Sequence, residues 1–186
     1  MQSGEECYRR FLDGDKSGFD ELMDIYHDSL IRFVQRYVKS EADAEDIAAD
    51  TFLELLIHPK RYSFKSSMKT YIFSVAHNKS VNFLRKNGRI ADFDTEALAD
   101  MSISDIGGAD EIEKSEMQMT VQKALGKING EYAEVLYLIY FEGLGTDDAA
   151  RVMKKNKKQI SNLIYRAKAA MKQELERGGF SYDGQG

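Results

Sequence analysis

The sequence is poor in three residue types that mark particular classes of protein. Among its 186 residues it has one cysteine, one proline and no tryptophan. The single cysteine, Cys7, cannot form an internal disulfide, which excludes a disulfide-stapled secreted scaffold and favours a reducing cytosol. A single proline, Pro59, leaves long helices with little to interrupt them.

Long hydrophobic runs are also missing. The longest run, at residues 135–141, is far shorter than the roughly 20 apolar residues that a membrane-spanning helix needs. Residues 1–6 contain neither a basic nor an apolar stretch, so we expect no signal peptide. With 42% apolar and 31% charged residues, the composition predicts a cytoplasmic protein with packed cores.

Charge is distributed unevenly around a net value of -5. Residues 88–116 carry two basic and nine acidic side chains. Residues 58–89 and residues 151–172 each carry eight basic side chains and no acidic one. Charge segregated in this way indicates binding partners, and the two basic windows favour a polyanion such as nucleic acid.

Apolar residues recur at helical spacing nearly throughout, and no stretch alternates as a strand would. The pattern predicts an all-α fold: two small helical domains joined by a flexible acidic linker, the second domain containing a helix-turn-helix. We expect the N-terminal domain at residues 1–87, the linker at 88–116 and the C-terminal domain at 117–186. The linker could be a plain solvated tether or could have a docking role.

In the N-terminal domain we expect helices at about residues 19–37, 41–57 and 68–86, with Pro59 ending the second one. In the C-terminal domain, a short helix at about 146–153, a turn at 154–156 and a long helix at about 157–177 have the form of a helix-turn-helix. Thr146 is expected to cap the short helix.

The outward face of the long C-terminal helix suits DNA. Asn162 and Arg166 can make paired contacts to base edges, each worth roughly 1–3 kcal/mol of discrimination. Lysines such as Lys157 and Lys158 suit phosphates, which set register and salt dependence. A solvated lysine-rich face is the alternative, and the absence of any acid at residues 151–172 argues against it.

The N-terminal domain combines an acidic helix with a basic, aromatic segment. Helical steps place Asp43, Asp46 and Asp50 on one face, where their mutual repulsion suggests a basic partner. Residues 60–71 interleave cations with aromatic rings, an arrangement typical of single-stranded nucleic-acid sites that track the backbone and stack on bases. Tyr62 and Phe64 could equally belong to the core.

Other chemistries fit less well. Asp13 to Gly18 has the beginning of a calcium loop, but Asp24 stands where a bidentate glutamate is needed. The three histidines lack metal-ligand spacing, and Cys7 has no catalytic partner motif. We therefore expect no enzyme, no metal, no cofactor and no small-molecule substrate.

Three segments of the sequence resemble the extracytoplasmic-function group of bacterial sigma factors, in the sigma-70 family. Residues 43–55 are similar to the family helix that binds the polymerase clamp. Residues 70–79 are similar to its helix facing the −10 promoter element. Glu142-Gly143-Leu144, followed by the helix-turn-helix and Tyr165-Arg166-Ala167-Lys168, is similar to its −35 reader. The chain departs from the family where Tyr71 replaces a tryptophan and Lys154 replaces a turn glycine, which would be strained if left-handed.

The resemblance implies three sets of site residues and no catalytic residue. The polymerase-binding set is Asp43, Glu45, Asp46, Asp50 and Phe52. The −10 DNA-binding set is Lys60, Arg61, Tyr62, Phe64, Lys65, Lys69, Tyr71, Asn78, Lys79, Asn82 and Arg85. The −35 DNA-binding set is Lys157, Lys158, Gln159, Ser161, Asn162, Tyr165, Arg166 and Lys168.

The resemblance also implies the partners. They are core RNA polymerase, through its β′ clamp and β flap, promoter DNA, and an anti-sigma factor that sequesters the chain, if need be at the inner face of the membrane. The alternative is an autonomous helix-turn-helix regulator whose N-terminal domain dimerises or senses a ligand. That alternative explains residues 144–172 but neither the acidic helix nor the basic, aromatic segment.

Overall fold

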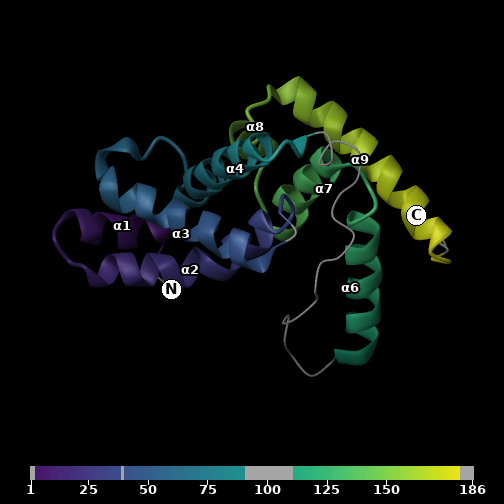
Figure 1. The fold of residues 1–186 in the computed structure, drawn as a ribbon, viewed down its shortest axis with the longest axis horizontal. Coiled ribbons are helices and arrows are strands. Elements are labelled where there is room, and N and C mark those ends of the chain that lie inside the picture. Colours follow the sequence, from purple (N-terminus) through teal and green to yellow (C-terminus); the bar gives the residue numbers. More distant parts are fainter. Residues whose placement is uncertain (1–2, 39, 91–110, 181–186) are drawn as a thin grey trace.

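The protein is described from a computed structural model, which covers residues 3–38, 40–90 and 111–180. The N-terminal elements are α1 (Gly4–Leu12), α2 (Ser17–Val34), α3 (Glu41–Ile57), the short 3-10 helix η1 (Pro59–Arg61) and α4 (Met68–Lys86). The C-terminal elements are α6 (Glu111–Leu125), α7 (Gly130–Leu136), the π-helix η2 (Tyr137–Phe141), α8 (Thr146–Val152) and α9 (Lys157–Arg177). All regular elements in these ranges are helical, which confirms the predicted class (Figure 1).

The first two helices pack together unusually closely. A Cβ atom at Gly18 would lie 2.4 Å from the backbone oxygen of Cys7, so only glycine allows this approach. Tyr8 of α1 is fully buried, and its hydroxyl donates to the backbone oxygens of Leu55 and Pro59 at 3.0 and 3.2 Å. Helix α1 was not among the helices expected from the sequence. Through Tyr8 it is bonded to the C-terminal end of α3.

Helices α3 and α4 begin at serine caps. The hydroxyls of Ser40 and Ser67 accept from the backbone N–H groups of Asp43 and Thr70. A serine cap satisfies one of the free N–H groups of the first turn and is worth about 1 kcal/mol. Both helices have the predicted bounds.

In the C-terminal domain the sequence prediction needs one correction. Thr146 does not cap α8: Gly145 is the cap residue, and no side chain bonds to the first turn. Helix α7 continues at Tyr137 as the π-helix η2. Lys154, between α8 and α9, has φ +53°, so the left-handed conformation expected for the family's turn glycine is present here on a lysine.

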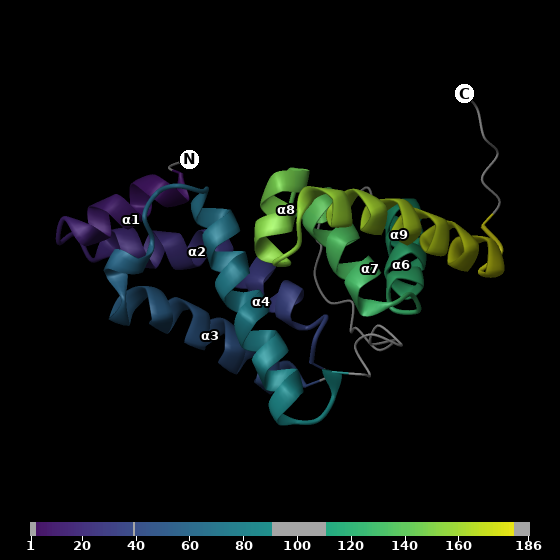
Figure 2. The same cartoon turned by 90° about the horizontal axis from the view of Figure 1, so that it is seen from above.

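The two domains contact each other along α4, which packs against α8 (Figure 2). The ring of Phe33 also lies 6.2 Å from that of Tyr137, centroid to centroid. Most of the predicted linker, residues 91–110, lies outside the described residues, and α6 begins at Glu111, within the range assigned to the linker. None of the helices in the described ranges is long and apolar enough to span a bilayer.

Candidate nucleic-acid and polymerase interfaces

The carboxylates on the first half of α3 form an acidic ridge, which we define as Asp43, Glu45, Asp46 and Asp50. The last three are exposed, and Asp43 is half-buried beside its Ser40 cap. Mutual repulsion between these groups is offset in part by the positive N-terminal end of the helix, which favours carboxylates. The ridge therefore presents a concentrated negative surface, whose repulsion the helix end relieves mainly at Asp43.

Phe52 does not join this surface. Its side chain is 3% exposed and meets the Phe19 ring edge-on at 6.4 Å, so it belongs to the core. Three aliphatic side chains on the outer side of α3 were not among the predicted binding residues. Leu53, Leu56 and Ile57 are 46%, 42% and 59% exposed. We call these three residues the apolar shelf.

The acidic ridge and the apolar shelf are continuous. Asp46, Asp50, Leu53 and Ile57 follow one another at steps of 4, 3 and 4, which is a single stripe of an α-helix. A stripe that begins with carboxylates and ends with exposed aliphatic groups can bind a partner that is both basic and apolar. The spacing is visible in the sequence and could have identified the shelf.

The loop between η1 and α4 carries aromatic rings stabilised from α1. Tyr62 is 4% exposed and its hydroxyl donates to the Ser66 backbone oxygen at 2.7 Å, so it supports the loop rather than offering a free face. Phe64 is half-buried with its ring 4.5 Å from that of Tyr62, and the Arg9 guanidinium lies 4.9 Å above it. Phe64 has φ +58°, a costly conformation for a bulky residue.

The cations of η1 and of the loop after it are exposed. Lys60 and Lys65 are free to meet solvent, whereas Arg61 pairs with the Glu54 carboxylate at the end of α3. The backbone N–H of Met68, at the start of α4, donates to Glu5 Oε1 at 2.6 Å. Helix α1 thus fixes both ends of the loop and adds Arg9 to its positive surface.

The predicted −10 residues on α4 divide into two groups. Asn82 and Arg85, near its C-terminal end, are exposed. Lys69, Tyr71, Asn78 and Lys79 are half-buried. Lys69 is engaged: its ammonium lies 2.8 Å from the Glu142 carboxylate and donates to the Glu142 backbone oxygen at 2.7 Å.

Helix α9 presents the predicted −35 surface almost intact. Its exposed side chains include Lys158, Ser161, Asn162, Arg166 and Tyr165, the last of which is 79% exposed. Two predicted residues are engaged locally. Gln159 completes a capping box with Asn156, and Lys157 lies 3.1 Å from Asp147.

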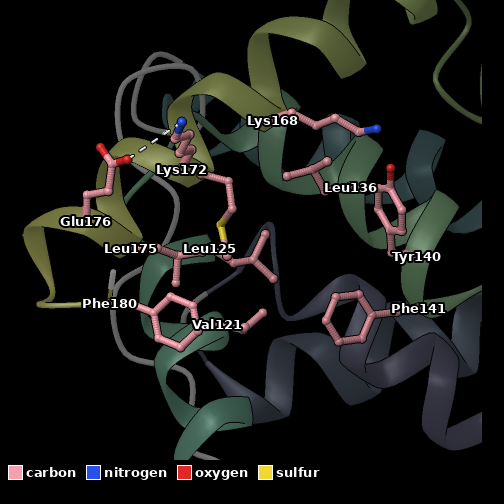
Figure 3. Close-up of a pocket in the computed structure, with 11 residues that line it drawn as sticks. Val121, Leu125, Leu136, Tyr140, Phe141, Lys168, Lys172, Leu175, Glu176 and Phe180 are labelled. Atoms are coloured by element: carbon pink, nitrogen blue, oxygen red, sulfur yellow. Dashed lines mark ion pairs between the residues drawn. The ribbon is translucent and has the colours of Figure 1, made fainter. Parts of the chain in front are cut away.

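Lys168 sits apart from that reading surface. Its ammonium lies 5.5 Å from the Tyr140 ring, at the edge of an apolar groove of about 520 Å³ (Figure 3). The lining residues are Val121, Leu125, Leu136, Tyr140, Phe141, Lys168, Met171, Lys172, Leu175, Glu176 and Phe180. Tyr140 and Phe141 at its wall are 57% and 46% exposed, so the groove presents an apolar surface to solvent.

The contact between the domains contains buried charge. Glu134 of α7 is 1% exposed, and its carboxylate lies 2.8 Å from Nδ1 of His77 on α4. Arg36, 8% exposed, places its guanidinium 3.9 Å from the centre of the Tyr137 ring. Burial lowers the pKa of Arg36 to about 10, although Tyr137 and the carboxylates of Glu134 and Glu142 oppose that shift.

Tyrosine hydroxyls at this contact stay neutral. Burial raises the pKa of Tyr37 well above its usual range, with the Glu134 carboxylate as a second cause. Burial likewise raises the pKa of Tyr137, and the carboxylate of Glu142 adds to the effect. Both hydroxyls therefore remain hydrogen-bond donors at neutral pH.

The calcium alternative finds no support in the described residues. The Arg10 guanidinium occupies the loop, bonded to Asp15 at 2.7 Å and to Glu21 at 2.8 Å. In the part of the chain that the structure describes, no group of histidine, cysteine, aspartate or glutamate side chains is arranged to hold a metal ion.

Two parts of the chain match models of one protein family. Residues 22–90 match the family model for Sigma-70 region 2, and residues 118–171 match that for Sigma-70, region 4. The RNA polymerase sigma-H factor of Pseudomonas aeruginosa is 25% identical over 184 residues, which cover 95% of each chain. The ECF RNA polymerase sigma factor SigM of Bacillus subtilis is 24% identical over 159 residues, 86% of this chain and 96% of its own.

One relative is longer. The ECF RNA polymerase sigma factor BldN of Streptomyces coelicolor is 25% identical over 163 residues, and the match covers 62% of its length. Among solved structures, the sigma factor RpoE of Bartonella quintana, in complex with the anti-sigma factor NepR, has the same fold. Its TM-score is 0.66 at 20% identity, with 85% of this chain and 96% of that chain covered. CnrH, in complex with the cytosolic domain of CnrY, gives a TM-score of 0.64 at 19% identity, with 92% and 96% covered.

The matched regions together include the acidic ridge, helix α4 and the helix-turn-helix. The chain belongs to the sigma-70 family, as an extracytoplasmic-function sigma factor that binds core RNA polymerase and promoter DNA to start transcription.

Proposed function

We propose that three separate surfaces divide the work of this sigma factor. The acidic ridge and the apolar shelf of α3 bind the β′ clamp of core polymerase. The loop after η1, with the outer face of α4, holds the opened strand of the −10 element. The exposed face of α9 reads the −35 duplex. The proposal is carried by the distribution of charge. Helices α4 and α9, which belong to different domains, are both cationic, whereas the carboxylates gather on α3, which is part of neither proposed DNA surface.

Charge and side-chain type support the assignment of the DNA surfaces. Arg85 and Asn82 on α4, Lys60 in η1 and Lys65 on the loop are exposed and have no acidic neighbour in sequence. The three cations can follow a phosphate backbone, while Asn82 can donate hydrogen bonds and Phe64 offers a partly exposed ring for a base. On α9, Asn162 and Arg166 suit base edges.

The groove beside α9 supports a further partner. Its apolar lining and the two lysines at its rim, Lys168 and Lys172, fit an amphipathic helix with an acidic edge. The β flap of polymerase and an anti-sigma factor are the candidates. Of the two similar structures, one contains the anti-sigma factor NepR and the other the cytosolic domain of CnrY.

The proposal extends to two general properties. The protein catalyses no reaction of its own, since its role is to place core polymerase on a promoter. It works in the cytoplasm, where core polymerase and promoter DNA are found, and an anti-sigma factor would hold it in reserve there.

Charge reversal on the ridge tests the proposal. In run-off transcription with core polymerase on genomic fragments, Asp46→Lys/Asp50→Lys should abolish initiation from the promoters that the unmodified protein selects. Asp24→Lys, on an exposed carboxylate of α2, is the control and should transcribe normally. Unchanged initiation by the double variant, or tight binding of a palindromic site by a dimer without polymerase, would overturn it.

A further inference from the structure

One face of α1 contacts the loop between η1 and α4 along its whole length. Glu5, Tyr8 and Arg9 follow one another at helical steps of three and one, so they lie on the same side of α1. Tyr8 bonds to the backbone of η1, Arg9 lies over an aromatic ring of the loop, and Glu5 accepts from the backbone at the start of α4. Helix α1 lies outside residues 22–90, which match the family model, so the match assigns this face no role.

Two adjacent arginines of α1 have different surroundings. The Arg10 guanidinium is bonded to the carboxylates of Asp15 and Glu21 at 2.7 and 2.8 Å, which holds α1 to α2. Arg9 is exposed, and its guanidinium lies 4.9 Å from the centre of the Phe64 ring. Arg10 therefore has a structural role, whereas the charge of Arg9 faces solvent beside the loop.

The Phe64 ring lies between the core and Arg9. Its centroid is 4.5 Å from that of Tyr62 and 6.5 Å from that of Tyr8, and both tyrosines are buried. Because these rings belong to the core and Arg9 is exposed, Arg9 lies on the side of Phe64 that solvent reaches. A base that approaches Phe64 from solvent therefore meets the Arg9 guanidinium, a group that packs on aromatic faces and also binds phosphate oxygens in pairs.

The carboxylates that contact this part of the chain are engaged with protein groups. Glu54 pairs with Arg61, and Glu5 accepts a hydrogen bond from the first backbone N–H of α4 at 2.6 Å. Arg9 from α1 and Lys65 from the loop are exposed cations on the same segment. A site for a single strand needs this combination, because cations bind the phosphates while an aromatic ring packs against an unstacked base.

We propose that Arg9 is a strand-binding residue of the −10 site. Its guanidinium binds the backbone phosphate of the nucleotide whose base reaches Phe64, through paired charge-assisted hydrogen bonds. The proposal rests on the strand-binding role that we propose for the loop. It goes further in that the site is a composite of the loop and of α1, a helix outside the matched family region.

The test measures how holoenzyme binds a fluorescent promoter fragment that is mispaired over its −10 element. The promoter is one that the unmodified protein selects in run-off transcription. Arg9→Ala should weaken binding about five- to tenfold and reduce the slope of log affinity against log salt by about 0.7, the value for one phosphate of a single strand. Arg9→Lys should keep the slope and lose part of the affinity, because it keeps the charge without the paired bonds.

Two controls make the result specific. Arg32→Ala removes an exposed arginine of α2 and makes the same change in net charge, so it should bind normally. A duplex fragment that ends upstream of the −10 element should bind Arg9→Ala holoenzyme and unmodified holoenzyme equally. Thermal melts show whether Arg9→Ala is folded, and Arg9→Gln, which keeps more of the stem over Phe64, replaces it if not.

Lys65→Ala, in the loop itself, separates the possible failures. If Lys65→Ala lowers the salt slope and Arg9→Ala does not, the role of Arg9 is overturned and that of the loop stands. Weaker binding by Arg9→Ala at an unchanged slope also overturns the proposal, because Arg9 then only supports the Phe64 ring. If neither variant changes the slope or the affinity, the strand-binding role of the loop fails as well.

Discussion

Two neighbouring residues of α3, Phe52 and Leu53, should respond to alanine in opposite ways. Phe52 is 3% exposed and packs on Phe19, whereas Leu53 is 46% exposed on the apolar shelf. We therefore expect Phe52 to stabilise the fold and Leu53 to contribute to binding. The two alanine variants therefore distinguish a loss of stability from a loss of polymerase binding.

The magnitudes are set by burial. Removing a buried phenylalanine side chain costs about 3–5 kcal/mol of unfolding free energy, through lost burial and the cavity that remains. For a domain of this size that lowers Tm by at least about 12 °C. Leu53→Ala leaves no cavity, so its unfolding free energy should change by less than about 0.5 kcal/mol.

Binding should show the reverse pattern. An exposed aliphatic side chain that becomes buried at an interface is worth about 1–2 kcal/mol, a five- to thirtyfold change in affinity. Leu53→Ala should weaken binding to core polymerase by about that factor. At a temperature where Phe52→Ala is still folded, that variant should bind normally. Melting followed by circular dichroism and titration of labelled protein with core polymerase give the two quantities. The reasoning fails if Leu53→Ala keeps full affinity or if Phe52→Ala melts normally.

Three other predictions concern the turn, the core and the reading helix. Lys154→Gly should raise the unfolding free energy by up to about 1 kcal/mol in thermal melts, because glycine adopts the left-handed conformation without strain. Burial raises the pKa of Tyr8 to about 12, so its contribution to stability is complete below about pH 10 and is lost as the pH rises through 12. Tyr8→Phe should lessen the alkaline loss in melts from pH 8 to pH 11.5. Arg166→Ala should relax −35 base preference in binding assays, whereas Lys158→Ala should weaken all sequences alike and reduce the salt slope by about 1.

The sequence predicted those helices best whose ends have strong local signals. Ser40 and Ser67 satisfy the first turns of α3 and α4, and Pro59 prevents α3 from continuing. These are effects between residues close in the chain, so the bounds follow from local chemistry alone. The capping box of Ser3 and Glu6 gave the same signal for α1, but the short helix has too few apolar repeats for periodicity to detect it.

The site was predicted less evenly, because periodicity finds the faces of a helix without saying which face is covered. Helix α3 has apolar residues on two sides, and only packing against α2 shows that Phe52 belongs to the core and Leu53 to the surface. On α9 the core stripe is narrow, so the exposed reading face could be obtained by subtraction.

The contact between the domains joins residues that are far apart in the chain, so no rule about neighbouring residues predicts it. Two of its residues are nevertheless unusual in the sequence. Glu134 lies within the strongly apolar segment 133–141, and Arg36 lies among Phe33, Val34 and Tyr37. A charge at such a position is costly unless a partner of opposite sign arrives from elsewhere, so each residue by itself predicts a distant partner. In the structure Glu134 meets His77 of the other domain, and the Arg36 guanidinium lies over the ring of Tyr137, so both charged residues constrain how the domains meet.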